Sequence, residues 1–146
     1  MPEPRTQNGQ RPTLNAQRPK NSIAGRPDFD LEERLLSHAA EVIRLTERLP
    51  SSRAGNHVAG QLLRPGTSPL PNHGEAPAAE SRDDFLPKLS IGLKELRESR
   101  RWLRLTHRVP FLRELSTVET LIQETEELIL IFAKSIKTAK AGRVER

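Results

Sequence analysis

Apolar residues recur along most of the chain at steps of three and four, the spacing that places side chains on one face of an α-helix. The pattern is clear over residues 30–49, 81–108 and 114–139. No stretch alternates apolar and polar residues as a half-buried strand would. Three amphipathic helices leave one side of a core open, and a fourth segment closes it. We therefore predict an all-α protein, an antiparallel up-and-down four-helix bundle over residues 28–141.

The predicted core follows from the same spacing. In the first helix it comprises Leu31, Leu35, Ala39, Val42, Leu45 and Leu49, with Leu36 and Ile43 widening the stripe. In the third it comprises Phe85, Leu89, Gly92 or Leu93, Leu96, Trp102 and Leu103. In the fourth it comprises Leu115, Val118, Leu121, Ile122, Thr125, Leu128, Ile129, Phe132 and Ile136. Asp30 and Glu33 have the spacing of a capping box, which predicts that the first helix starts at Asp30.

The second segment is the difficult one. It begins near Ser52, and its inward residues are Val58, Leu62 and Leu63. Four prolines follow, at positions 65, 69, 71 and 77. Each proline inside a helix removes a hydrogen bond and clashes with the preceding turn, at about 3 kcal/mol apiece. On this argument residues 65–80 form a loop or a broken, kinked helix.

Composition separates the two ends of the chain from the bundle. Residues 1–27 are rich in Pro, Gln, Asn and Arg, and they hold five basic residues against one acidic residue. Such a segment buries too little apolar surface to offset its ordering entropy, so we predict a disordered, basic tail. Residues 142–146 are expected to fray. The 119 residues after the tail carry 19 basic and 18 acidic side chains, so most of the net charge of +5 belongs to the tail.

Several classes of function lack support in the sequence. No apolar run approaches the roughly 20 residues of a membrane helix, and the chain has no cysteine. The four histidines, His38, His57, His73 and His107, lack metal-binding spacing, so we expect them at or near the surface. No nucleophile elbow or phosphate loop is present. We expect a cytoplasmic protein with no enzymatic activity, no cofactor and no metal.

Basic residues supply the candidate binding surface. Arg97, Arg101, Arg104 and Arg108 step by four, three and four, so they share one face of the third helix. A guanidinium offers a fork of donors that matches phosphate oxygens, so this face could bind RNA or DNA. The alternative is structural, because acidic residues of the fourth helix could pair with it; these are Glu114, Glu119, Glu124, Glu126 and Glu127. Lys134, Lys137 and Lys140 form a second basic series, which strengthens the binding reading if the two series meet on one surface.

The chain resembles a family of bacterial four-helix-bundle proteins first noted as encoded in intervening sequences of large-subunit ribosomal RNA genes, most specifically in its second half. The resemblance covers about residues 28–140. Its motifs are Gly66-Thr67-Ser68, Asn72, Glu75-Ala76, Ala79-Glu80-Ser81-Arg82, Asp84-Phe85, Lys88-Leu89-Ser90-Ile91, Lys94-Glu95-Leu96-Arg97-Glu98-Ser99, Trp102-Leu103-Arg104-Leu105, Glu124-Thr125-Glu126-Glu127-Leu128 and Lys134-Ser135-Ile136-Lys137-Thr138-Ala139-Lys140.

The resemblance implies a ring-shaped homo-oligomer, a homopentamer, without enzymatic activity. It also implies that residues 66–79 belong to the second helix or its kinked continuation, against the proline argument. On that reading Asn72 and Glu75 satisfy backbone groups freed at the kink, or pair with Arg82 or Lys88. A related bundle, the accessory protein of diversity-generating retroelements, binds a reverse transcriptase and nucleic acid. Two hypotheses follow: a self-assembling bundle that binds RNA or DNA, and a scaffold that binds only proteins.

Overall fold

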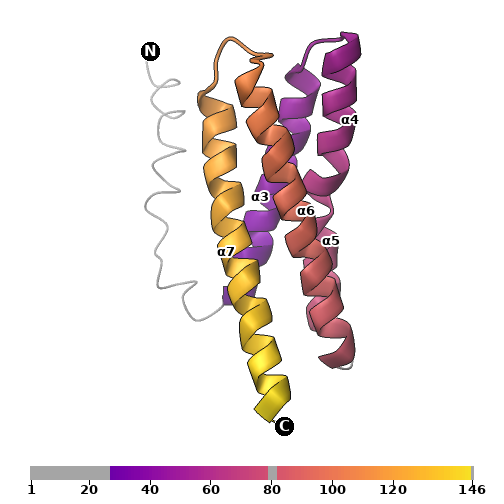
Figure 1. Cartoon of the computed structure of the whole chain (residues 1–146), viewed down its shortest axis with the longest axis vertical. Coiled ribbons are helices and arrows are strands. Elements are labelled where there is room, and N and C mark those ends of the chain that lie inside the picture. Colours follow the sequence, from indigo (N-terminus) through magenta and orange to yellow (C-terminus); the bar gives the residue numbers. More distant parts are fainter. Residues whose placement is uncertain (1–26, 79–81, 146) are drawn as a thin grey trace, which may run out of the picture. The chain divides into compact units, whose positions relative to one another are not determined.

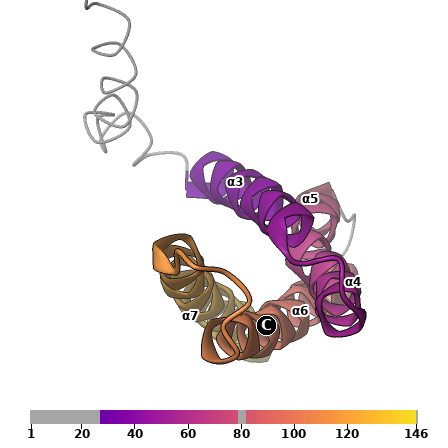
Figure 2. The ribbon, with the colours of Figure 1, turned by 90° about the horizontal axis from the view of Figure 1, so that it is seen from above.

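The protein is an all-α, antiparallel four-helix bundle. The computed structural model describes residues 27–78 and 82–145, so the predicted disordered tail lies outside it. Arg34–Arg146 form one compact unit, which contains the bundle. The helices are α3 (Pro27–Arg48), α4 (Arg53–Thr67), α5 (Pro69–Ala78), α6 (Arg82–Arg108) and α7 (Ser116–Glu145). Viewed end-on, they follow one another around the bundle, with α4 and α5 together forming the second arm (Figures 1 and 2).

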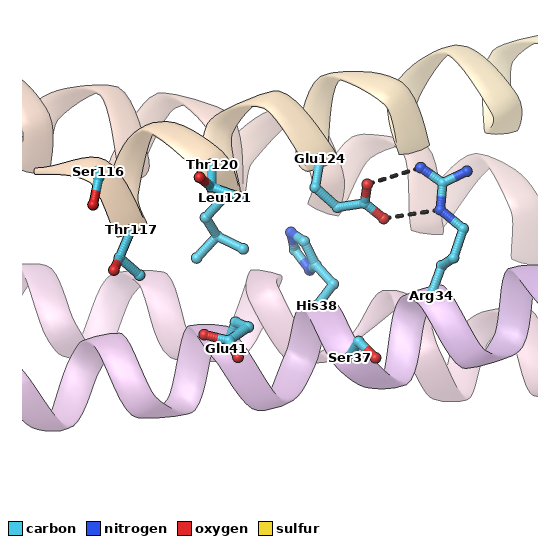
Figure 3. Close-up of a pocket in the computed structure, with 9 residues that line it drawn as sticks. All are labelled: Arg34, Ser37, His38, Glu41, Ser116, Thr117, Thr120, Leu121 and Glu124. Atoms are coloured by element: carbon cyan, nitrogen blue, oxygen red, sulfur yellow. Dashed lines mark hydrogen bonds and ion pairs between the residues drawn. The ribbon is translucent and has the colours of Figure 1, made fainter. Parts of the chain in front are cut away.

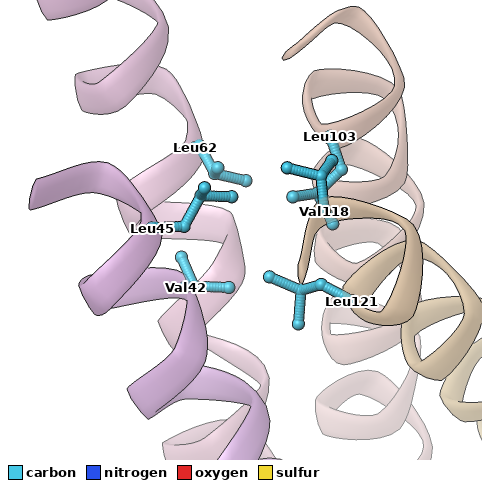
Figure 4. Close-up of a cluster of buried hydrophobic side chains, with 6 residues drawn as sticks. All are labelled: Val42, Leu45, Leu62, Leu103, Val118 and Leu121. Carbon is cyan, nitrogen blue, oxygen red and sulfur yellow. The ribbon is translucent and has the colours of Figure 1, made fainter. Parts of the chain in front are cut away.

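The core confirms most of the predicted apolar stripe. One cluster joins four helices and consists of Val42, Leu45, Leu62, Leu103, Val118 and Leu121 (Figure 4). Outside this cluster, Leu96 of α6 and Leu128 and Phe132 of α7 are fully buried as well. The three-and-four spacing therefore identified the inner face of each helix correctly.

Three predicted core residues are on the surface instead. Leu36, Ile43 and Leu63 are 49%, 45% and 41% exposed. Each directly follows a buried residue on its helix, so it is turned about 100° away from the interior. The sequence reading made the buried stripe of α3 and α4 too wide.

The structure confirms the predicted start of α4 near Ser52, whereas the start of α3 and the end of α7 differ from the prediction. Ser52 caps α4, since its hydroxyl accepts a hydrogen bond from the Gly55 N–H at 3.0 Å. α3 starts at Pro27, so the predicted cap at Asp30 is wrong and Asp30 lies in the first turn. Proline suits this first position because the N–H it lacks would have no helical partner. α7 continues to Glu145 and so covers most of residues 142–146.

The proline-rich second arm is helical through residue 78, which corrects the loop alternative and supports the kinked continuation. α4 contains Pro65, α5 begins at Pro69, and Ser68 between them keeps right-handed helical angles (φ −66°, ψ −29°). The Ser68 N–H donates to the Arg64 carbonyl at 2.9 Å, and the Asn72 N–H donates to the Ser68 carbonyl at 3.2 Å. Helical hydrogen bonds therefore flank the junction, while the proline nitrogens contribute none.

Two glycines allow helices to approach closely. A Cβ on Gly66 of α4 would lie 2.6 Å from Val42 Cγ1 of α3. A Cβ on Gly92 of α6 would lie 2.6 Å from Phe132 Cε2 of α7. Real Cβ atoms essentially never make contacts this short, so a larger residue at either position would force the neighbouring side chain to shift. The Gly92–Phe132 contact lies between α6 and α7.

Candidate nucleic-acid interface and the pocket between α3 and α7

The predicted arginine face is solvent-exposed. Arg97, Arg101, Arg104 and Arg108 are all exposed on α6. Within residues 82–145 and the other described ranges, none of the four makes an ion pair or a side-chain hydrogen bond. Their guanidinium donors therefore face solvent.

The structural alternative for these arginines is not seen among the described residues, because none of the four contacts a glutamate of α7 and three of those glutamates have other partners. Glu124 and Glu127 bind Arg34 of α3, with Nη2–Oε1 distances of 2.8 and 2.9 Å. Glu119 contacts the ring of His107, with Nε2 and Oε2 2.8 Å apart. Helices α6 and α7 lie side by side, and in the described part of the chain His107–Glu119 is the ionisable pair that joins them, without any of the four arginines.

A shallow groove of about 310 Å³ runs along this seam. It is lined by Arg104, His107, Arg108, Glu119, Ile122 and Glu126. Two arginines on one wall face two glutamates on the other, so its local charge is mixed.

The second basic series lies on the same side of the bundle, further along α7. Lys134, Lys137 and Lys140 are exposed. Lys137 follows Glu126 by three helical turns, so both occupy the line of α7 that borders the α6 arginines. We call the exposed cations of this side the basic strip: Arg97, Arg101, Arg104, Arg108, Lys134, Lys137 and Lys140. The two series therefore lie on one side of the bundle, at different positions along the helix axes.

The predicted polar cluster is only partly within the described side chains. Asn72 Nδ2 donates to the Ser68 carbonyl at 3.0 Å and to its Oγ at 3.3 Å, across the α4–α5 junction. That carbonyl already accepts the Asn72 N–H, so the Asn72 side chain reinforces the junction and does not satisfy a carbonyl freed by proline. Lys88 is half-buried on α6. The side chains of Glu75 and Arg82 lie outside the described residues.

A pocket of about 480 Å³ lies between α3 and α7 and was not predicted (Figure 3). Its α3 wall holds Arg34, His38 and Glu41, and its α7 wall includes Leu121 and Glu124. The Arg34 guanidinium binds the Glu124 carboxylate through two atoms, Nε–Oε2 at 2.9 Å and Nη2–Oε1 at 2.8 Å. These carboxylates raise the pKa of Arg34, so it is charged at every relevant pH.

His38 joins three helices at the inner end of this pocket. It is 2% exposed, and its Nε2 lies 2.7 Å from Thr125 Oγ1 of α7. Burial lowers the pKa of His38, although the Glu124 charge and a hydrogen bond with the Gly66 backbone oppose the shift. Thr125 also donates to the Leu121 carbonyl at 2.7 Å. His38 is therefore an uncharged, buried ring at neutral pH.

The expectation of surface histidines is thus wrong for His38, and for His73, which is 5% exposed. Sequence reasoning also missed Arg34. A signal was present, since Arg34, His38 and Glu41 recur at steps of four and three beside the apolar stripe. From the sequence alone, such a line of polar residues is interpreted as a solvent-exposed helix face, because the position of the partner helix is unknown.

Comparison with known proteins places the chain in a family. No family model and no curated protein matches the sequence. Among solved structures, a protein of unknown function from the S23 ribosomal protein family of Bacteroides thetaiotaomicron is 31% identical, with a TM-score of 0.69. The alignment covers 75% of this chain and 97% of that chain. The chain belongs to the S23 ribosomal protein family.

Membership in the S23 family accounts for the bundle, because nearly the whole of the related protein is matched. A shared fold does not define an activity, so function has to be argued from the surfaces described above. Across the described helices of this family member, none is long and apolar enough to cross a membrane.

Proposed function

We propose that this S23 family member is a non-enzymatic, self-assembling bundle that binds RNA or DNA through the basic strip. The observation that carries the proposal is the state of the arginines: exposed, on one line of α6, and unpaired in the described part of the chain. Arginines that served only to join helices would contact glutamates of α7. Free guanidinium groups at this spacing suit phosphate oxygens.

Binding to phosphates makes a specific prediction about salt. Each neutralised phosphate releases counterions, so affinity falls steeply as the salt concentration rises. Fluorescence anisotropy with labelled nucleic acid at 50 and 200 mM salt measures this fall. An Arg101→Glu/Arg104→Glu variant should lose binding. An Arg44→Glu/Arg53→Glu variant, with the same charge change on α3 and α4, should retain it.

The rival function is a scaffold that binds only proteins. It gains support if the protein fails to bind any nucleic acid at 50 mM salt. Equal binding by the two double variants would instead mean that nucleic acid binds outside the basic strip. The resemblance to proteins encoded in intervening sequences of ribosomal RNA genes, and by analogy to a reverse-transcriptase accessory protein, favours nucleic acid over the scaffold.

Self-assembly is supported by the exposed apolar residues of the opposite side. Leu36 and Ile43 lie two turns apart on α3, and Leu63 lies on the adjacent α4. All three are more than 40% exposed. Apolar side chains grouped in this way are typical of protein interfaces. We propose that this face joins copies of the chain into the homopentamer that the family resemblance implies.

Light scattering tests the assembly directly. We expect a pentamer at micromolar concentration and a smaller species for Ile43→Glu/Leu63→Glu. Leu130→Glu is the matched control, because Leu130 is 69% exposed on α7, away from this face. A monomeric wild-type protein would contradict self-assembly without affecting the proposal on nucleic acid.

A further inference from the structure

We infer that the basic strip binds the phosphate backbones of double-stranded nucleic acid and does not bind unstacked single strands. This inference rests on the proposed function and specifies its ligand. It follows from three properties of the strip: its length, its straightness and the chemistry of the side chains along it.

The strip is long because its two basic series lie at successive levels. Helices α6 and α7 are antiparallel, and His107 opposite Glu119 places Arg108 beside residue 118 of α7. From that level to Lys140 the strip spans roughly 33 Å at 1.5 Å per residue. Both edges are α-helical throughout. The cations therefore form a straight, rigid row, on which a stiff duplex docks with little ordering cost, whereas a flexible strand loses conformational entropy when it lies along the row.

The strip offers few of the groups that bind single strands. Proteins that hold single strands stack the bases on aromatic side chains. In the described part of the chain, Phe132 is fully buried, and the half-buried Trp102 packs edge-on against His57 of α4, with ring centroids 5.9 Å apart. Phe85 and Phe111 are half-buried. The His107 ring, which lines the groove, is held by Glu119. The large exposed residue on the strip's line of α7 is Leu130, which is aliphatic and has no π-face.

Two glutamates on the same line limit the affinity. Glu119 and Glu126 line the groove beside Arg104 and Arg108. Glu126 is exposed and has no ion pair among the described residues. A phosphate held by Arg104 would be repelled by this carboxylate. Removing that charge should tighten binding, which a purely structural role for the strip would not produce.

The test compares labelled 20-base-pair duplex RNA, 20-base-pair duplex DNA and a 20-nucleotide single strand of mixed sequence, by anisotropy at 50 and 200 mM salt. We expect both duplexes to bind about tenfold or more tightly than the single strand, because stacking contributes little here. Glu126→Gln should tighten duplex binding about two- to fivefold, since one repulsive charge is removed. Arg44→Glu/Arg53→Glu should change neither value.

The inference on duplexes and the proposed function are tested separately by these measurements. If the single strand binds as tightly as the duplexes, the inference is overturned while the proposed function stands. An unchanged affinity for Glu126→Gln would count against the strip as the binding surface, and with it against both the inference and the binding site in the proposed function. If none of the three nucleic acids binds at 50 mM salt, the proposed function itself fails. A difference between duplex RNA and duplex DNA identifies the natural source of the phosphates, and either result supports the inference.

Discussion

Helix α7 packs against its two neighbours in different ways. Against α6 it makes an apolar contact in which the fully buried Phe132 covers Gly92 without space for a methyl group. Against α3 it makes polar contacts, namely the Arg34–Glu124 pair and the His38–Thr125 bond, beside a pocket of about 480 Å³. Close apolar packing contributes most of the stability of a bundle, whereas polar contacts contribute less but specify which residues meet.

The largest effect should follow from opening the apolar contact. Phe132→Ala removes a fully buried ring and leaves a cavity over Gly92, so we expect a loss of about 3–5 kcal/mol in the free energy of unfolding. Urea denaturation followed by circular dichroism measures it. Leu130→Ala, an exposed position on the same helix, should change stability by no more than about 0.5 kcal/mol. Equal effects of the two changes would contradict the apolar seam.

Filling the same contact should also destabilise. Gly92→Ala places a methyl group against Phe132, and overpacking of this kind costs about 1–3 kcal/mol. Gly60→Ala is the matched control, because nothing lies within 4 Å of a Cβ there. Alanine is the better helix former by about 1 kcal/mol, so this control should be stabilised. Thermal unfolding of the two variants should therefore shift in opposite directions.

The polar contact should respond to pH. Because the pKa of His38 is lower in the folded protein than its ordinary value of 6.5, unfolding at acidic pH takes up a proton. The stabilisation is therefore complete above pH 6.5 and is lost as the pH falls below it, with a slope of up to about 1.4 kcal/mol per pH unit. His38→Gln should flatten the pH dependence of the denaturation midpoint between pH 7 and 5. An unchanged slope would mean that His38 stays uncharged after unfolding or is already charged in the fold.

The smallest effect is expected at the Arg34 pair. Its partly exposed position, with 28% of the side chain accessible, means that solvent and salt screen the interaction. We expect Arg34→Met to cost about 1 kcal/mol at low salt and less in 1 M NaCl. The Arg64 pair with Glu95, which joins α4 to α6, provides a comparison through Arg64→Met. If Arg34→Met lowered the free energy of unfolding as much as Phe132→Ala does, the polar contact would contribute as much stability as the apolar contact, which would contradict this ranking.

The sequence predicts the fold well because burial follows helical periodicity. Leu35, Val42 and Leu45 of α3 are all buried as expected. The position of the arginine face on α6 was also predictable, since spacing alone places residues on one side of a helix. The pairing of charges was not, because it depends on the relative rotation of helices, and Glu124 faces Arg34 of α3.

The second arm shows why a local penalty can mislead. The cost of proline in a helix assumes an uninterrupted ladder of hydrogen bonds, but Pro69 occupies the first position of α5, where an N–H has no helical partner anyway. Pro65 and Pro69 are also buried, so they contribute to the core. The proline positions therefore predicted correctly that the arm is interrupted. The arm is nevertheless helical on both sides of the interruption, where its prolines at 65 and 69 are buried.

The prolines of this arm also act on the chain before it folds. A pyrrolidine ring holds φ near −65°, close to the helical value, so residues 65, 69 and 71 have few conformations to lose when the arm docks. Replacing one of them by alanine would restore a backbone donor and, at the same time, free the denatured chain to explore more space. The arm with the poorest helical hydrogen bonding is thus also the one whose ordering demands the least entropy.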